Sequence, residues 1–113
     1  MIIEARKLAR LCREIALDKK AEDVVILDVR QISTVADYLV ICSGLSEPQL
    51  KAIAEETMRR LREQGIRAKH HVGAPPSRWV ILDFGDVMFH IFHPELRERY
   101  ALEQLWGDAK RVR

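Results

Sequence analysis

One stretch of this chain, Arg78–Phe92, constrains the fold more than any other, because it is typical of two β-strands joined by a tight turn. Gly85-Asp86 supplies the Gly-X pair that two-residue hairpin loops use. With that pair in the turn, alternation along the strands gives one wholly apolar face. The six residues of this face pair across the hairpin as Val80 with Ile91, Leu82 with Phe89, and Phe84 with Val87.

The alternative register places Phe84-Gly85 in the turn. It would set Asp83 opposite Asp86, and like charges that face each other destabilise a strand pair. It would also put Phe84 at a turn position that favours Gly or Asn. We therefore predict the first register.

The opposite face of the predicted hairpin combines different chemical groups. It carries Trp79, Ile81, Asp83, Met88, His90 and Phe92. Two aromatic rings beside a carboxylate and an imidazole suit neither an ordinary core nor an ordinary surface. Aromatic residues are enriched in interface hot spots, although they are core material as well. We interpret this face as a recognition surface that the chain's own helices leave uncovered.

Length and composition fit one domain over residues 1–113, since 48% hydrophobic residues can form a core without disulfides or metals. The net charge of +2 gives no whole-chain sign of a nucleic-acid binder, but basic residues gather at both ends of the chain. Two interpretations stay open: contact with an acidic partner such as RNA, or solvated helix faces and a frayed tail. The basic residues concerned are Arg6, Lys7, Arg10, Arg13, Lys19 and Lys20 at the amino end, and Lys110, Arg111 and Arg113 at the carboxyl end.

Two cysteines, Cys12 and Cys42, lie in predicted elements with no Cys or His beside them, which favours buried free thiols in a reducing compartment. No stretch reaches the roughly 20 apolar residues of a membrane span. The start of the chain lacks a signal-peptide hydrophobic region. We expect a cytoplasmic protein without membrane contact.

The remaining pattern predicts the order α-β-β-α-β-β-β-α, an α/β domain with a mixed sheet of about five strands flanked by helices. Ser46 and Gln49 form a capping-box pair at the start of one helix, and Gly65 ends it. Helices are expected over residues 3–17, 46–65, from 93 onward and around 102–106, strands over 24–29 and 35–42, a weak strand within 66–72, and loops over 31–34 and 73–77.

The loop Ser43–Ser46, between a strand and a helix, is a place where a phosphate can bind. A nucleotidyltransferase would also need paired acids for magnesium, but Asp83 and Asp86 straddle a turn and no other suitable pair occurs. A helix cap is the favoured interpretation of this loop. The histidines have no metal-ligand spacing. A hydrogen-bonded pair of His90 with Asp83 stays open, whereas no nucleophile stands beside it. For His90 itself, partner contact and a structural role beneath a helix both stay open. We expect no metal and no cofactor.

Two segments resemble the signatures of the ribosomal silencing factor (Iojap-like) family. The first is Asp28–Ser46 with Gln49, and the second is Trp79–Phe92, and the resemblance runs from about Leu8 to Ala109. After the second segment, the matching residues are Glu95, Arg97, Tyr100, Leu102, Glu103, Leu105 and Trp106.

The resemblance implies a nucleotidyltransferase-like fold that lacks the catalytic acids. It implies a translational repressor, not an enzyme, that binds the large ribosomal subunit through universal large-subunit protein fourteen and blocks joining of the small subunit. Related organellar proteins act in large-subunit assembly. The sequence leaves open a contact of the basic ends with ribosomal RNA, and it fits a monomer or a weak homodimer. The rival interpretation is a small nucleotidyltransferase-like enzyme.

The resemblance also assigns the partner-binding residues: Trp79, Asp83, His90 and Phe92, extended or braced by Tyr100, Glu103, Leu105 and Trp106, with Tyr38 on the same side if its strand lies beside the hairpin. Two positions depart from the family pattern. Val72 stands before Gly73 where relatives often carry an acid, and Arg99 stands before Tyr100 where they tend to carry an aromatic residue. These departures concern contacts near the loop and the last helix.

Overall fold

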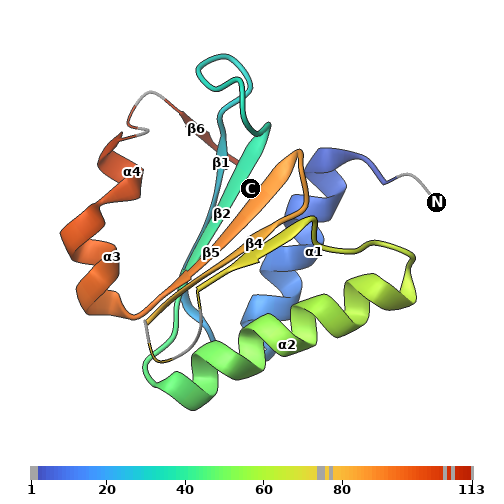
Figure 1. Cartoon of the computed structure of the whole chain (residues 1–113). Coiled ribbons are helices and arrows are strands. Elements are labelled where there is room, and N and C mark those ends of the chain that lie inside the picture. The colour runs from blue at the N-terminus through green and yellow to red at the C-terminus, as the bar shows by residue number, and fades with distance from the viewer. Residues whose placement is uncertain (1–2, 74–75, 77, 106, 108, 113) are drawn as a thin grey trace.

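The computed structural model describes residues 3–73, 76, 78–105, 107 and 109–112, and for Tyr100, Leu102 and Leu105 only the backbone (Figure 1). Its elements are α1 (Ala5–Asp18), β1 (Glu22–Asp28), β2 (Tyr38–Ser43), α2 (Glu47–Glu63), β3 (His70–Val72), β4 (Trp79–Asp83), β5 (Val87–Phe92), α3 (Pro94–Tyr100), α4 (Leu102–Leu105) and β6 (Lys110–Arg111). Within this part of the chain, no helix is long and apolar enough to cross a membrane.

The strands form one sheet in the order β3-β4-β5-β2-β1-β6. β2 and β5 run parallel, and the other described neighbours run antiparallel. The predicted mixed α/β fold is confirmed, but the sheet has six strands where we expected about five. The additional strand is β6, which lies along β1 where the sequence left open a frayed tail.

The predicted register of the β4–β5 hairpin is confirmed. Val80 lies opposite Ile91 and Leu82 opposite Phe89, and the Phe84 N–H donates to the Val87 carbonyl at 2.9 Å. Gly85 has a φ of +92°, a conformation that side chains with a Cβ rarely adopt. The Gly85 N–H donates to Asp83 Oδ1 at 2.8 Å, so the turn is fixed by Gly85 and by the carboxylate beside it.

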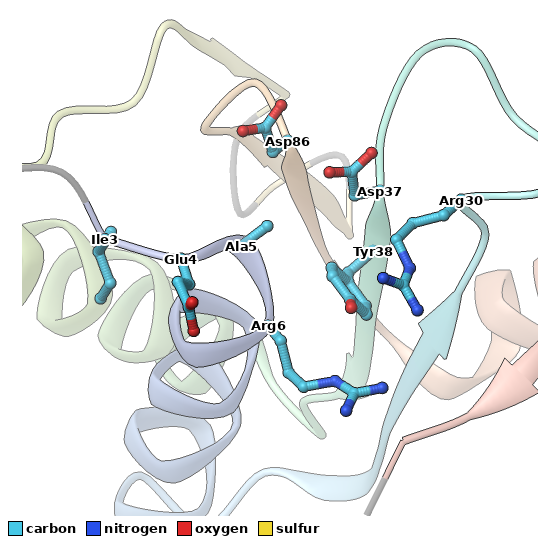
Figure 2. A pocket seen from close by; sticks show the side chains of 8 residues that line it. All are labelled: Ile3, Glu4, Ala5, Arg6, Arg30, Asp37, Tyr38 and Asp86. Atoms are coloured by element: carbon cyan, nitrogen blue, oxygen red, sulfur yellow. The ribbon is translucent and has the colours of Figure 1, made fainter.

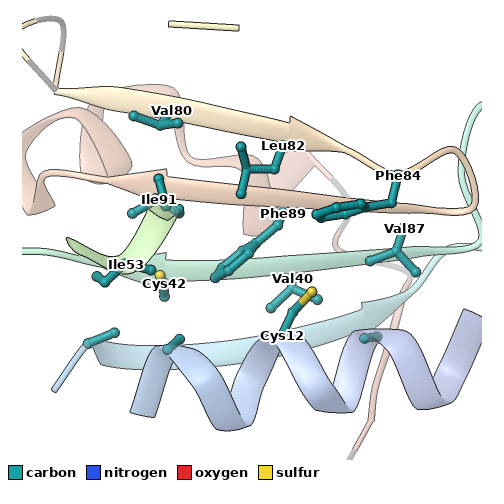
Figure 3. Packing of buried hydrophobic residues seen from close by; sticks show 14 of the residues in the cluster. Cys12, Val40, Cys42, Ile53, Val80, Leu82, Phe84, Val87, Phe89 and Ile91 are labelled. Atoms are coloured by element: carbon teal, nitrogen blue, oxygen red, sulfur yellow. The ribbon is translucent and has the colours of Figure 1, made fainter. Parts of the chain in front are cut away.

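Helices α1 and α2 cover the wholly apolar face of the hairpin (Figures 1 and 3). Figure 3 shows how this face meets side chains of β2 and of the two helices around Phe89. All six predicted face residues belong to the main core cluster, as do Leu8, Cys12, Ile26, Val40, Cys42, Leu50, Ile53 and Leu61. The alternation in the hairpin was therefore sufficient to identify the center of the core.

The start of α2 is capped as the sequence predicted, with one difference. Ser46 Oγ accepts a hydrogen bond from the Gln49 N–H at 3.2 Å. Gln49 Oε1 accepts from the Leu45 N–H at 2.7 Å, rather than from the N–H of the capping serine as in a capping box. Its amide nitrogen donates to the carbonyls of Lys19 and Lys20 at 3.2 and 2.8 Å, which joins α2 to the end of α1.

Several predicted strand boundaries shift. β2 begins at Tyr38 and not at Val35, because Ser33 Oγ accepts hydrogen bonds from the N–H groups of Val35 and Ala36 and turns the chain there. The weak strand predicted within residues 66–72 is reduced to β3. Part of the predicted loop 73–77 lies outside the described residues.

The second face of the sheet is covered less completely. α3 and α4 lie on this side, away from α1 and α2 (Figure 1). A smaller cluster of buried residues packs here: Leu27, Val29, Ala36, Leu39, Ile41 and Phe92. Trp79, Met88 and Leu96 of α3 pack against this cluster as half-buried residues.

Candidate functional site

Three rings of the predicted recognition face form a stacked cluster. Cross-strand pairing places Trp79 opposite Phe92, and their ring centroids are 4.7 Å apart with 30° between the planes. His90 stacks on Phe92 at 5.8 Å and 8°, and the Trp79 Nε1–H donates to His90 Nδ1 at 3.3 Å. The indole of Trp79 is therefore held from two sides.

Burial determines the chemistry of His90. The residue is only 7% exposed, and desolvation lowers its pKa to about 4. The ring is therefore neutral near pH 7, and its Nδ1 accepts the hydrogen bond from the indole. His90 lies inside the ring cluster and offers no charge to a partner.

The expectation of an uncovered face is wrong for Phe92, and His90 takes the structural role that the sequence left open. Phe92 is fully buried and His90 nearly so. The reason lies in the chain that follows β5: α3 begins at Pro94, and Leu96 packs into the same cluster as Phe92. These two rings lie beneath the surface and support Trp79. The residues of the face that keep solvent access are Trp79, Ile81, Asp83 and Met88, all half-buried.

The pair of Asp83 with His90, which the sequence left open, does not form. Asp83 lies opposite Met88, whereas Ile81 lies opposite His90. On its other side Asp83 lies opposite His70, and its Oδ2 is 3.3 Å from His70 Nδ1. The hairpin thus leaves Asp83 at the edge of the ring cluster, bonded to the exposed His70 of β3.

Tyr38 does not share the face of Trp79. β2 does lie beside β5, but Tyr38 points to the other side and belongs to the main core. There it lines a cleft of about 470 Å³ at the start of α1, together with Glu4, Arg6, Asp37 and Asp86 among others (Figure 2). Carboxylates and guanidinium groups of both signs line this cleft, so its charge selects no single class of ligand.

Glu103 forms an ion pair within the chain. Its Oε1 accepts from Arg97 Nε at 2.8 Å, and Arg97 Nη1 donates to Ser43 Oγ at 2.8 Å. The hydrogen bond from Arg97 lowers the pKa of the Glu103 carboxyl. Glu103 thus connects α4 to α3 and, through Arg97, to the end of β2. Trp106 and the side chains of Tyr100 and Leu105 lie outside the described part of the chain.

The loop Ser43–Ser46 serves as a packed helix start. The Gly44 N–H donates to the Phe92 carbonyl at 2.8 Å, and the Leu45 N–H donates to Gln49. A Cβ on Gly44 would lie 2.8 Å from Leu50 Cδ2, so any larger residue there would have to displace the Leu50 side chain. These contacts favour the helix-cap interpretation over a phosphate site. Across the described residues, no group of three or more His, Cys, Asp or Glu is placed to hold a metal ion.

Two residues of the surface, Ile81 and Met88, were missing from the predicted site although the alternation of the hairpin had placed them on that face. Only their position on that face could have identified them as surface residues, because an Ile or a Met in a strand is equally common in a core. The buried pair of Arg97 with Glu103 had no signal beyond a spacing of six residues.

The family model described as "Ribosomal silencing factor during starvation" matches residues 2–113. Ribosomal silencing factor RsfS of Halalkalibacterium halodurans is 47% identical over 107 residues, which cover 95% of this chain and 92% of the relative. The protein of the same name from Bacillus subtilis is 50% identical over 92 residues, or 81% of this chain and 78% of the relative.

A crystal structure of a Chromobacterium violaceum protein superimposes with a TM-score of 0.89 at 30% identity, covering 93% of this chain and 88% of that chain. A more distant mouse relative, named "Mitochondrial assembly of ribosomal large subunit protein 1", is 32% identical over 78% of this chain and 40% of its own length. Since the family model and the bacterial relatives match along most of the sequence, this chain belongs to the family of ribosomal silencing factors.

Proposed function

We propose that this protein represses translation by binding the large ribosomal subunit through universal large-subunit protein fourteen, where it blocks joining of the small subunit. Membership of the ribosomal silencing factor family supports the repressor role. The name of the mouse relative supports the large subunit as the partner and a role in its assembly.

The observation that carries the proposed binding surface is the state of Trp79. Its indole stacks on Phe92 and donates to His90, yet the residue stays half-buried at the surface. Large aromatic side chains that are fixed before binding make strong anchors, because little conformational freedom is lost on association. Ile81 and Met88 extend the apolar area, and the Asp83 carboxylate meets basic groups of the partner and sets the register.

Tyr100, Glu103, Leu105 and Trp106 remain a proposed extension of this surface. The backbone of α3 and α4 lies on the same side of the sheet as the ring cluster (Figure 1). Glu103 contributes by orienting Arg97 and α4, since its charge already pairs within the chain.

The repression proposed here is steric and involves no turnover. The internal hydrogen bonds of the Ser43–Ser46 loop and the bonds of Asp83 to Gly85 and His70 support this view. A nucleotidyltransferase would be stabilised by its ligands, because a ligand that binds only the native state raises stability. We expect magnesium with nucleoside triphosphates to leave the thermal midpoint unchanged; a concentration-dependent rise would favour the enzyme.

Co-sedimentation with isolated large subunits tests the proposal directly. The protein should pellet with large subunits and not with small ones. Small subunits added to the loaded complex should then fail to join, whereas they join large subunits that carry no protein. Joining at the normal level would contradict the steric mechanism even if binding is observed.

Replacement of the anchor tests the assigned surface. Trp79→Ala should weaken binding to large subunits by at least about 2 kcal/mol, near thirtyfold, because a hot-spot side chain is lost. The matched control is Leu17→Ala, which truncates an exposed apolar residue of α1 on the other side of the sheet. A folded Trp79→Ala variant, judged by circular dichroism, that binds like the control would show that the surface is wrongly assigned.

A further inference from the structure

The two basic ends of the chain meet in the folded protein. β6 pairs with β1 so that Lys110 lies opposite Asp28, and the Val112 N–H donates to the Ile26 carbonyl at 2.9 Å. Arg13 of α1 donates from Nη1 to the Val112 carbonyl at 3.4 Å across 99 residues of sequence. The carboxyl-terminal segment is thereby held against both β1 and α1.

This arrangement creates a positive surface that we call the basic edge, formed by Arg6, Arg10, Arg13, Arg30 and Lys110. The first three follow one another at i, i+4 and i+7 and so share one flank of α1. The bond of Arg13 to Val112 shows that this flank faces β6. Lys110 extends from the strand edge on the side of Asp28, beside Arg30.

Asp28 is the acid at the center of the basic edge, and its negative charge is already paired with Arg30. Arg30 binds both carboxylate oxygens, at 3.0 and 2.8 Å, and the Asp28 side chain is only 13% exposed. The hydrogen bond from Arg30, with a smaller contribution from Arg6, lowers the pKa of the carboxyl. Glu4, Asp37 and Asp86 line the cleft of mixed charge beside Arg6, at one end of the surface, while within the described residues Arg6 and Lys110 form no salt bridge.

In helix α2, by contrast, the charged side chains are placed where they stabilise the helix and its contacts. Its first turn carries an acid and its last turn two arginines, as the helix dipole favours. Arg59 and Arg60 pair with Glu56, and Arg60 also pairs with Asp18. The first turn of α1 contains Arg6 and no acid, although the N-cap residue before it is Glu4. Among the cations of the basic edge, Arg13 and Arg30 serve the fold through Val112 and Asp28, whereas ion pairing within the described residues does not account for Arg6 and Lys110.

We propose that the basic edge binds the phosphate backbone of RNA on the ribosomal subunit, an inference that rests on the proposed function. Guanidinium groups suit phosphate oxygens because they donate two parallel hydrogen bonds. A cleft of about 80 Å³ between Arg30 and Lys110 gives room for such a contact. Several cations side by side suit the closely spaced charges of an RNA backbone, and the one exposed apolar residue that lines this cleft is Ile32.

The basic edge and the Trp79 surface are separate. β4 and β1 lie three places apart in the sheet, and α1 covers the face opposite to Trp79. Substitutions at one surface therefore leave the other intact. The two contacts also differ in physics: phosphate binding releases counterions and weakens steeply with salt, whereas an apolar anchor does not.

The test is the double variant Arg6→Ala with Lys110→Ala, against the control Lys51→Ala with Arg67→Ala, which removes the same charge from exposed sites on and after α2. Binding to large subunits is measured between 50 and 200 mM salt. The double variant should lose at least about tenfold in affinity at 100 mM. Its plot of log affinity against log salt should be shallower by about 1 to 2, while the control follows the wild type.

Three further outcomes decide the inference. A labelled RNA duplex should bind the wild type and the control better than the double variant. This measurement tests the basic edge independently of the ribosome. If the wild type fails to bind subunits, that failure contradicts only the proposed function. An unchanged salt dependence in the folded double variant would overturn the inference. An equal loss of affinity for purified protein fourteen would also overturn it, because the partner would then be that protein.

Discussion

At His90, burial and one hydrogen bond fix the protonation state of an imidazole. Desolvation lowers its pKa from the ordinary value of 6.5 to about 4. The unfolded chain takes up a proton below pH 6.5, but the folded protein resists this until about pH 4. Stability is therefore complete above pH 6.5 and falls as the pH decreases toward 4.

This difference predicts a measurable pH dependence. Between pH 7 and pH 5 the free energy of unfolding should fall by about 2 kcal/mol through His90. Glu56 contributes little in this window, because its carboxyl is ionised above pH 5 in both states: hydrogen bonds from Arg59 and Arg60 lower its pKa to about 2 in the folded protein, and its ordinary value is 4.5. Urea unfolding at several pH values measures the effect.

The control is His90→Phe, which keeps a buried ring and removes the titration. Its stability should vary less between pH 7 and pH 5 than that of the wild type. The Trp79 indole loses its acceptor in this variant, so binding to large subunits should also weaken. Parallel pH profiles of the two proteins would contradict the assigned pKa.

At the scale of elements, Gln49 connects three segments. Its side chain bonds to Leu45 before α2 and to the carbonyls of Lys19 and Lys20 after α1. The contact of α1 with α2 therefore depends in part on one amide group.

Gln49→Ala should lower the free energy of unfolding by about 1 kcal/mol, because the Lys19 carbonyl, which lies in a half-buried residue, and the exposed Lys20 carbonyl and Leu45 N–H lose their partner. Lys51→Ala, on the exposed side of the same helix, is the matched control and should change stability by less than about 0.5 kcal/mol. Denaturant titration of both variants gives the comparison. Equal stabilities would show that water replaces the side chain of Gln49 at little cost.

At the scale of the whole molecule, the predicted free thiols report on global unfolding. Cys12 and Cys42 are fully buried in the core beside Val40 and Phe89 (Figure 3). Burial raises the pKa of both thiols, that of Cys42 to about 12. A thiolate is the reactive species, so neither cysteine can react while the core is closed.

Thiol reagents should consequently label the native protein only as fast as it opens. Both cysteines should react at once in denaturant. The destabilised Gln49→Ala variant should be labelled faster than wild type, in proportion to its larger open population. Rapid labelling of the native wild type would show that the core opens locally around one of the cysteines.

Much of the fold follows from patterns within short segments. The Gly85-Asp86 turn, the alternation around it and the Ser46 cap each depend on neighbours in sequence, and each is confirmed. The segment around β6 had no such pattern. Two residues form a strand there only because β1 offers a free edge.

The candidate site shows the same division. By itself, the sequence determined which side chains share a face of the hairpin, because alternation is a property of the strand. The tertiary structure decided which of them reach solvent: α3 packs Leu96 over the cluster of Phe92, whereas Trp79 stays half-buried. It also decided that Tyr38 lies on the opposite face and that Arg13 meets the carboxyl-terminal segment. Burial and charge clustering depend on segments far apart in sequence, and only their packing brings them together.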